Sequence, residues 1–373
     1  MNNGIINFTS PYLRRKCLSF SALLILLLIT CGSLITCASN AAAFSSSLTA
    51  LDENPINTRI PLILIHGLFG KETPGYWQNF IDYFNSSNSL TGKYKLYKFE
   101  YDSNEVDVYT IALALKNDID SMEEFTGRDF VIIAHSIGGL VARSYMQEHS
   151  GSKRIRKLIT LASPHHGSPL ANDAPRTGKF DNPLLEVALK LIDNNFWCRG
   201  DLLCLSRDYV DITEPNRKDM LWDSYDSPGG ATGYNTCPEC NPWLQNLNSL
   251  SGNYNDKLIL YYGYLTSVNS SLYNSLADMG PVYLGNYLYE HRDDKSIVLA
   301  GASVILYHVY LAGDGLVPYD SGAFRAGIGI SDSQRRSFPG YNHDQMKDGV
   351  IENGTIPLFN AIKNDLESIA NIA

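Results

Sequence analysis

The sequence lacks a surplus of basic residues: 30 lysines and arginines stand against 39 aspartates and glutamates, which gives a formal net charge of −9. The first 43 residues hold three basic residues and no acidic one, so the remainder carries −12. Such an acidic chain repels polyanions, and this argues against nucleic acid as a partner. The acidity says nothing against an apolar ligand, because insertion into lipid depends on apolar area.

The sequence also lacks an internal repeat and a heptad run, which excludes a solenoid and a coiled coil. Short apolar runs alternate instead with helix-periodic segments, the pattern of a mostly parallel sheet covered by helices. The expected strands are Pro61–His66, Tyr94–Tyr101, Asp129–Ala134, Lys157–Ala162 and Lys257–Gly263. The expected helices are Tyr76–Phe84, Val106–Phe125, Gly138–Glu148 and a closing amphipathic helix from Ile356 to Ile369.

The N-terminal 43 residues differ from the rest of the chain. Three basic residues at 14–16 precede an apolar run at 18–35, the pattern of an export signal. Three endings remain open: cleavage after the small residues at 41–43, a lipoprotein-type Cys37, or retention of the run as a membrane anchor. We therefore expect an exported protein that is secreted, periplasmic or lipid-anchored at the cell envelope.

A linker is expected at 44–57 and a folded domain at 58–373, in which two insertions break the alternation. Residues 171–256 hold the four cysteines that follow the leader, Cys198, Cys204, Cys237 and Cys240. An even number of cysteines in an exported chain favours disulfides over a redox or zinc site, so we expect a stapled cap. Residues 267–312 form the second insertion, whose apolar run at 296–311 is either a buried element or a lid that meets lipid.

Residues 130–139 read FVIIAHSIGG, an apolar strand that runs directly into a helical pattern. In that strand–turn–helix context a serine takes strained backbone angles and exposes its hydroxyl, as a nucleophile requires. Side chains two residues away on either side would collide there, and the sequence has Ala134 and Gly138. Ser136 is therefore the predicted nucleophile, and the alternative is an ordinary surface serine after a buried strand.

A serine hydroxyl needs a histidine base, and that histidine needs a carboxylate partner. With such a turn, the order along the chain is serine, acid, histidine. His343, in the turn-rich loop PGYNHD before the last helix, is the predicted base. Asp314 is the predicted acid, because the glycines on both sides of it in GDGLVP permit a sharp turn. Asp293, Asp294 and Asp320 are weaker candidates.

The oxyanion formed on acyl attack needs backbone N–H donors. Ile137, the residue after the nucleophile, should provide one of them. Leu68 should provide the other, because it follows a strand in LILIHGLFG, where glycines let the main chain approach the substrate. His135 neighbours the nucleophile, but the turn is expected to point its side chain away.

Five motifs in the order PLILIHGLFG, VIIAHSIGG, ITLASPHHGS, GDGLVP and YNHDQM resemble those of the bacterial true lipases of the α/β-hydrolase fold. GPI inositol-deacylase-like and lecithin-acyltransferase-like proteins share much of the series. The resemblance covers roughly residues 58–170 and 257–370. It implies a mostly parallel central sheet flanked by helices, with an inserted cap or lid. It implies the same site residues, namely Ser136, Asp314, His343, Leu68 and Ile137, with 163–167 lining the site.

The resemblance further implies hydrolysis of carboxylic esters of lipids, with contact to a membrane or lipid interface. Alternatives are a phospholipase A or acyl-thioesterase of the same fold, or a non-catalytic surface binding protein on this scaffold. Calcium-binding lipases carry an acidic ligand two residues after the catalytic histidine. This chain has Gln345 there and Asp344 one place earlier, so neither calcium nor another cofactor is expected.

Overall fold

The structure is a computed structural model that describes residues 44–103, 106–168, 171, 218–221, 241–250, 254–279, 281–291, 294–310, 312–325, 327 and 329–371. The predicted export signal and the four cysteines of the predicted cap lie outside the described residues. Among the helices that the structure describes, none combines the length and the apolar character needed to cross a membrane.

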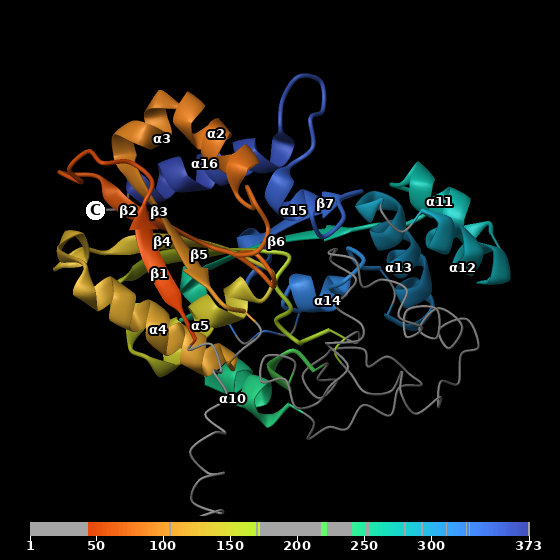
Figure 1. Ribbon diagram of the computed structural model, residues 1–373, viewed down its shortest axis with the longest axis horizontal. Coiled ribbons are helices and arrows are strands. Elements are labelled where there is room, and N and C mark those ends of the chain that lie inside the picture. The colour runs from red at the N-terminus through yellow and green to blue at the C-terminus, as the bar shows by residue number, and fades with distance from the viewer. Residues whose placement is uncertain are drawn as a thin grey trace, which may run out of the picture. The chain divides into compact units, whose positions relative to one another are not determined.

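A seven-stranded sheet with the order β1-β3-β2-β4-β5-β6-β7 forms the centre of the fold (Figure 1). Its strands are β1 (Ser46–Ala50), β2 (Ile60–Ile65), β3 (Tyr94–Tyr101), β4 (Phe130–His135), β5 (Ile155–Leu161), β6 (Leu258–Tyr264) and β7 (Arg335–Pro339). β1 runs antiparallel to β3, and the other neighbouring pairs are parallel. The five predicted strands correspond to β2–β6, whose apolar runs suit a sheet buried on both faces.

Neither edge strand is evident from the sequence. Residues 46–50 pair with β3, so the expectation of a linker at 44–57 is wrong for this stretch. The sequence SSLTA of β1 is short and polar, and its residues alternate between half-buried and exposed. β7 begins with two arginines. An edge strand is paired on one side only and tolerates such polar residues, which hide it from a search for apolar runs.

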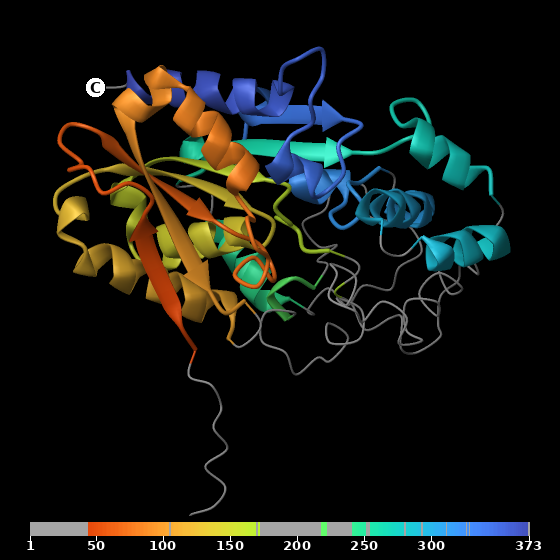
Figure 2. The same ribbon diagram turned by 45° about the horizontal axis from the view of Figure 1, so that its top comes forward.

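Helices cover both faces of the sheet (Figures 1 and 2). One face carries α2 (Gln78–Ser86), α3 (Asn88–Lys93) and α16 (Pro357–Ala370), and the other carries α4 (Val108–Ser121), α5 (Gly138–Glu148) and α10 (Pro242–Leu250). The short helices α14 (Tyr319–Gly322) and α15 (Gln345–Asp348) lie close to β6. The predicted apolar face of α4 is buried at Ile111, Leu115 and Ile119.

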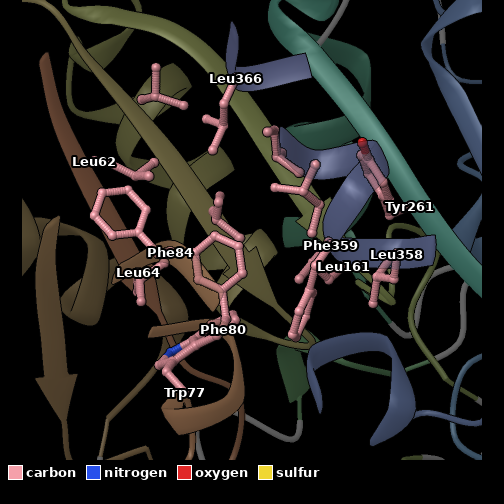
Figure 3. Close-up of a cluster of buried hydrophobic side chains, with 14 of the residues drawn as sticks. Leu62, Leu64, Trp77, Phe80, Phe84, Leu161, Tyr261, Leu358, Phe359 and Leu366 are labelled. Atoms are coloured by element: carbon pink, nitrogen blue, oxygen red, sulfur yellow. The ribbon is translucent and has the colours of Figure 1, made fainter. Parts of the chain in front are cut away.

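One apolar core, called the sheet cluster below, lies between the sheet and the first of these helix layers (Figure 3). Phe80 and Phe84 of α2 and Phe359 of α16 pack against strand residues such as Leu62 and Leu64. These residues come from both ends of the chain. The closing helix therefore completes the same core that the first parallel strands begin.

A second apolar core, called the helix cluster, occupies the insertion at 267–312. It is built by α11 (Ser271–Ala277), α12 (Pro281–Glu290) and α13 (Lys295–Tyr310), which lie beyond the end of β6 (Figures 1 and 2). The apolar run at 296–311 forms most of α13, and its residues 298–304 are buried. That described part is buried in the helix cluster, and a role of the segment as a lid stays a prediction.

Candidate active site

Ser136 occupies the sharp turn between β4 and α5. Its φ of 56° lies in the left-handed region that residues other than glycine seldom adopt. Its backbone N–H donates to the carbonyl of Leu161 at 2.9 Å, which ties the turn to β5. The serine is 9% exposed, and its hydroxyl makes no hydrogen bond to a residue that the structure describes. The structure therefore does not join the Ser136 hydroxyl to the imidazole of His343 by a hydrogen bond.

Glycines make room for this turn. A β-carbon on Gly138 would collide with the carbonyl oxygen of His66. A β-carbon on Gly67 would lie 2.7 Å from Cβ of Ser136 and 2.7 Å from the hydroxyl oxygen of Tyr76. The loop after β2 therefore crosses directly beside the nucleophile, and only a residue without a side chain fits at that point.

Asp314 and His343 form a buried pair. Nδ1 of His343 donates to Oδ2 of Asp314 at 2.8 Å, and both side chains are almost fully buried. Oδ1 of Asp314 accepts from the backbone N–H groups of Leu316 and Val317 at 2.9 and 2.7 Å. Because Nδ1 carries the proton that the carboxylate accepts, Nε2 keeps the lone pair that a general base needs.

Among the histidines whose side chains the structure describes, only His343 has a carboxylate partner within hydrogen-bond distance. Burial lowers the pKa of His66 and His166 to about 4, and it lowers the pKa of His135 and His165 well below the ordinary value. These four imidazoles are neutral at pH 7, because desolvation by burial is the largest influence on each pKa. His343 thus has the carboxylate partner that a base needs, and its role as the base stays a prediction.

Leu68 and Ile137 offer backbone amides next to Ser136. Within the described part of the chain, neither N–H donates a hydrogen bond. Ile137 precedes the first turn of α5, where the helix dipole favours negative charge. The loop around Leu68 is held by Phe69, whose N–H donates to Oγ of Ser103 at 2.8 Å. Two unengaged amides beside a nucleophile are what an oxyanion hole requires.

Two buried side chains near the site have no role in the sequence-based prediction. The hydroxyl of Tyr76 lies 3.0 Å from the backbone N of Gly67 and 2.5 Å from Nδ1 of His135. Nε2 of His135 lies 3.0 Å from the carbonyl oxygen of His343. The only sequence signal was a polar His135 at the end of an apolar strand.

Asn342 and Gln345 enclose His343 in the chain and bind each other. The N–H of Asn342 donates to Oε1 of Gln345 at 2.8 Å, and the N–H of Gln345 donates to Oδ1 of Asn342 at 2.9 Å. Gln345, at the position of the acidic calcium ligand in the resembling lipases, thus fixes the base loop here. Asp344 lies 3.8 Å from the ammonium group of Lys347.

The segment Ser163–Gly167, expected to line the site, contacts the elements around the acid loop. Oγ of Ser321 donates to the carbonyl of Gly167 at 2.8 Å. The next residue, Ser168, donates its hydroxyl to the carbonyl of Leu316 at 2.6 Å. Because Leu316 also binds Asp314, this segment supports the acid.

Comparison with known proteins finds similarity in the part of the chain that carries Leu68 and Ser136. Residues 57–195 match the model of the PGAP1-like alpha/beta domain, a match that includes Leu68 and Ser136 and ends before Asp314 and His343. The chain is 37% identical over 90 residues to phospholipase A(1) LCAT3 of Arabidopsis thaliana. That match covers 22% of this chain and 20% of the plant protein, so it spans about one fifth of the relative's length.

Two solved structures are also similar, each at 14% identity. The mature lipase BlEst2 of Bacillus licheniformis has a TM-score of 0.45, with coverage of 87% of this chain and 98% of that one. The monoacylglycerol lipase of Paleococcus ferrophilus has a TM-score of 0.40, with coverage of 87% and 99%. The sheet order, the turn at Ser136 and the family match give the chain the α/β-hydrolase fold, as the motifs predict. Its sequence is similar over residues 57–195 to the PGAP1-like alpha/beta domain and over 90 residues to a phospholipase A(1).

Proposed function

We propose that the protein is a serine hydrolase that cleaves carboxylic esters of lipids. The observation that carries the proposal is the buried Asp314–His343 pair, whose histidine is hydrogen-bonded through its carbonyl to the residue preceding the strained Ser136. A carboxylate, an imidazole and a serine hydroxyl on three separate loops at one end of the sheet have the chemistry of acyl transfer.

In the proposed reaction, Oγ of Ser136 attacks the ester carbonyl carbon while Nε2 of His343 takes the hydroxyl proton. The amides of Leu68 and Ile137 bind the oxyanion of the tetrahedral intermediate. His343 then gives its proton to the leaving alkoxide, and the C–O bond breaks to leave an acyl-serine. Water, deprotonated by His343, attacks that acyl group. The bond to Oγ of Ser136 then breaks, His343 returns the proton to Oγ, and the carboxylic acid leaves. Asp314 stays ionised and holds the imidazole in place.

The substrate class is the less specific part of the proposal. The match to a phospholipase A(1) favours a phospholipid ester as one candidate, and a triacylglycerol, a simpler ester or a thioester would use the same steps. The apolar helices α11–α13 next to the acid loop favour substrates with long acyl chains. The alternative to an enzyme is a binding protein that has the same fold but no catalytic activity.

Covalent labelling with a fluorophosphonate probe tests the reaction class. The folded protein should be labelled at Ser136, and Ser136→Ala should lose labelling and hydrolysis while its melting temperature stays unchanged. If the folded wild-type protein is not labelled at Ser136, the proposal of a serine hydrolase is wrong, and the alternative of a non-catalytic binding protein is favoured. Hydrolysis rates across acyl lengths, phospholipids and thioesters then separate the substrate classes.

Export is part of the same proposal, and the basic and apolar stretches within residues 1–43 support it. The mass of the N-terminal peptide of the natural protein distinguishes cleavage, lipidation at Cys37 and a retained anchor. An unmodified N-terminus on a protein found only in the cytoplasm would contradict export.

A further inference from the structure

We infer that Tyr76 and His135 are positioning residues that hold the oxyanion loop and the base in register with each other. The inference rests on the proposed function, because it concerns how that site is kept in shape. The observation behind it is a line of hydrogen bonds from the main chain of Gly67, one residue before Leu68, to the main chain of His343.

The direction of each hydrogen bond follows from chemistry. The carbonyl of His343 can only accept, so Nε2 of His135 must donate to it at 3.0 Å. Burial keeps His135 neutral by lowering its pKa, so Nδ1 has a lone pair and accepts the proton of the Tyr76 hydroxyl at 2.5 Å. The oxygen of Tyr76 is then left to accept the N–H of Gly67 at 3.0 Å. Every donor and acceptor along the line is used once.

Water has little access to this line, because Tyr76 is 8% exposed and His135 is 1% exposed. A buried polar group that loses its partner has no solvent to replace it, so removal of either side chain leaves a main-chain group unsatisfied. Neutral buried hydrogen bonds in series also strengthen one another. The line is therefore a connection whose members depend on each other.

The two ends of the line are the parts that must be placed most accurately for acyl transfer. A β-carbon on Gly67 would lie 2.7 Å from both Ser136 and Tyr76, so this glycine is enclosed between the nucleophile and the tyrosine. At the other end, His343 is held by its N–H, which donates to the carbonyl of Asp314 at 2.9 Å, and by its carbonyl, which binds His135. Movement at one end is passed to the other.

The test compares Tyr76→Phe with Tyr94→Phe. Tyr94 is also buried and donates its hydroxyl to the carbonyl of Leu366 at 2.6 Å, on the sheet face covered by α16 and outside the site. Both variants lose one buried hydroxyl. With a short soluble ester, Tyr76→Phe should lower kcat by about tenfold to hundredfold with little change in KM, because small misplacements of reacting groups cost rates of this order. Tyr94→Phe should keep the wild-type kcat.

Three further readouts separate positioning from mere folding. Tyr76→Phe should weaken inhibition by a boronic acid, which binds as a tetrahedral adduct, by the same factor as it lowers kcat. His135→Gln, whose amide can still donate to a carbonyl, should retain more activity than His135→Ala. The double variant Tyr76→Phe/His135→Ala should lose no more activity than the worse single variant, because both break the same line.

An unchanged kcat in Tyr76→Phe, or losses that multiply in the double variant, would overturn the inference while wild-type labelling at Ser136 leaves the proposed function standing. If the wild-type protein itself fails to label at Ser136, the proposed function fails and the inference fails with it. If Tyr94→Phe lowers kcat as much as Tyr76→Phe does, the role of Tyr76 is only structural.

Discussion

The sheet cluster and the helix cluster are built in different ways. The sheet cluster joins residues that are far apart in sequence, such as Phe80 and Phe359, and it underlies the strands whose ends carry the site. The helix cluster is local, because its members lie between Leu265 and Val304. A core made of distant segments fixes the loops between them, whereas a local core can change without disturbing the chemistry. The first cluster therefore supports the strands that carry the candidate site, and the second lies beside the loop of Asp314.

The two regions meet at the acid loop. A β-carbon on Gly315 would lie 2.6 Å from the carbonyl oxygen of Leu299 in α13, so the acid loop and this helix are in close contact. Oγ of Ser303 donates to the carbonyl of Gly313 at 3.2 Å, and the ammonium of Lys295 lies 3.8 Å from Asp344. α13 of the helix cluster thus contacts both neighbours of Asp314 in the chain, Gly313 and Gly315. Substitutions at these contacts test whether the helix cluster influences the site.

The largest effect is expected at the acid itself, in Asp314→Asn. The amide oxygen can still accept from Leu316 and Val317, so the fold should persist, but the carboxylate that fixes the His343 tautomer is gone. We expect kcat to fall by about 10³ to 10⁴ with an unchanged melting temperature. A small decrease in kcat would show that another carboxylate, such as Asp320, is the acid. The contacts of α13 with the loop of Asp314 would then have no bearing on the site.

Next in size are two truncations in the two cores. Phe359→Ala in the sheet cluster should lower the free energy of unfolding by about 3–5 kcal/mol, because it leaves a large cavity. Leu276→Ala in the helix cluster should cost about 2–5 kcal/mol locally. Hydrogen exchange should then rise along the chain in the first variant and only in α11–α13 in the second. If hydrogen exchange rises over the same residues in both variants, the two clusters unfold as one cooperative unit.

A smaller effect is expected from Gly315→Ala at the junction. Gly315 has φ of 104°, so an alanine is strained there and also meets the carbonyl of Leu299. Gly354→Ala is the matched control, because Gly354 has φ of 78° with nothing near its β-carbon position. Both should lower the melting temperature, but only Gly315→Ala should reduce kcat, by about tenfold. Equal kcat values would mean that α13 touches the acid loop without influencing it.

The smallest effect is expected from Lys295→Gln. The pair with Asp344 is 3.8 Å long and Lys295 is 44% exposed, so the change should cost less than about 1 kcal/mol. Lys116→Gln on α4, which breaks an exposed pair with Asp120, is the control. Urea unfolding at low and high salt measures both. A loss well above that of the control would mean that charge, rather than apolar packing, holds the helix cluster in place.

The sequence predicts the parallel strands and the nucleophile turn well because both depend on local patterns. The run in β2 is apolar throughout and the run in β4 is apolar up to His135, and Ser136 lies between small residues that only a tight turn requires. The acid and base follow from chain order and glycine-rich loops. β1 and β7 escape notice because edge strands can be polar. The role of Tyr76 could not be predicted from the sequence, because it depends on a contact with His135, which is 59 residues away in the chain. No local sequence pattern indicates such a contact.

The hydrogen bond from the N–H of Ser136 to the carbonyl of Leu161 continues the pairing of β4 with β5 as far as the nucleophile. Such a serine cannot drift out of place while those strands stay paired. On heating, Ser136 should therefore keep its place until β4 and β5 separate, even where α11–α13 have opened locally.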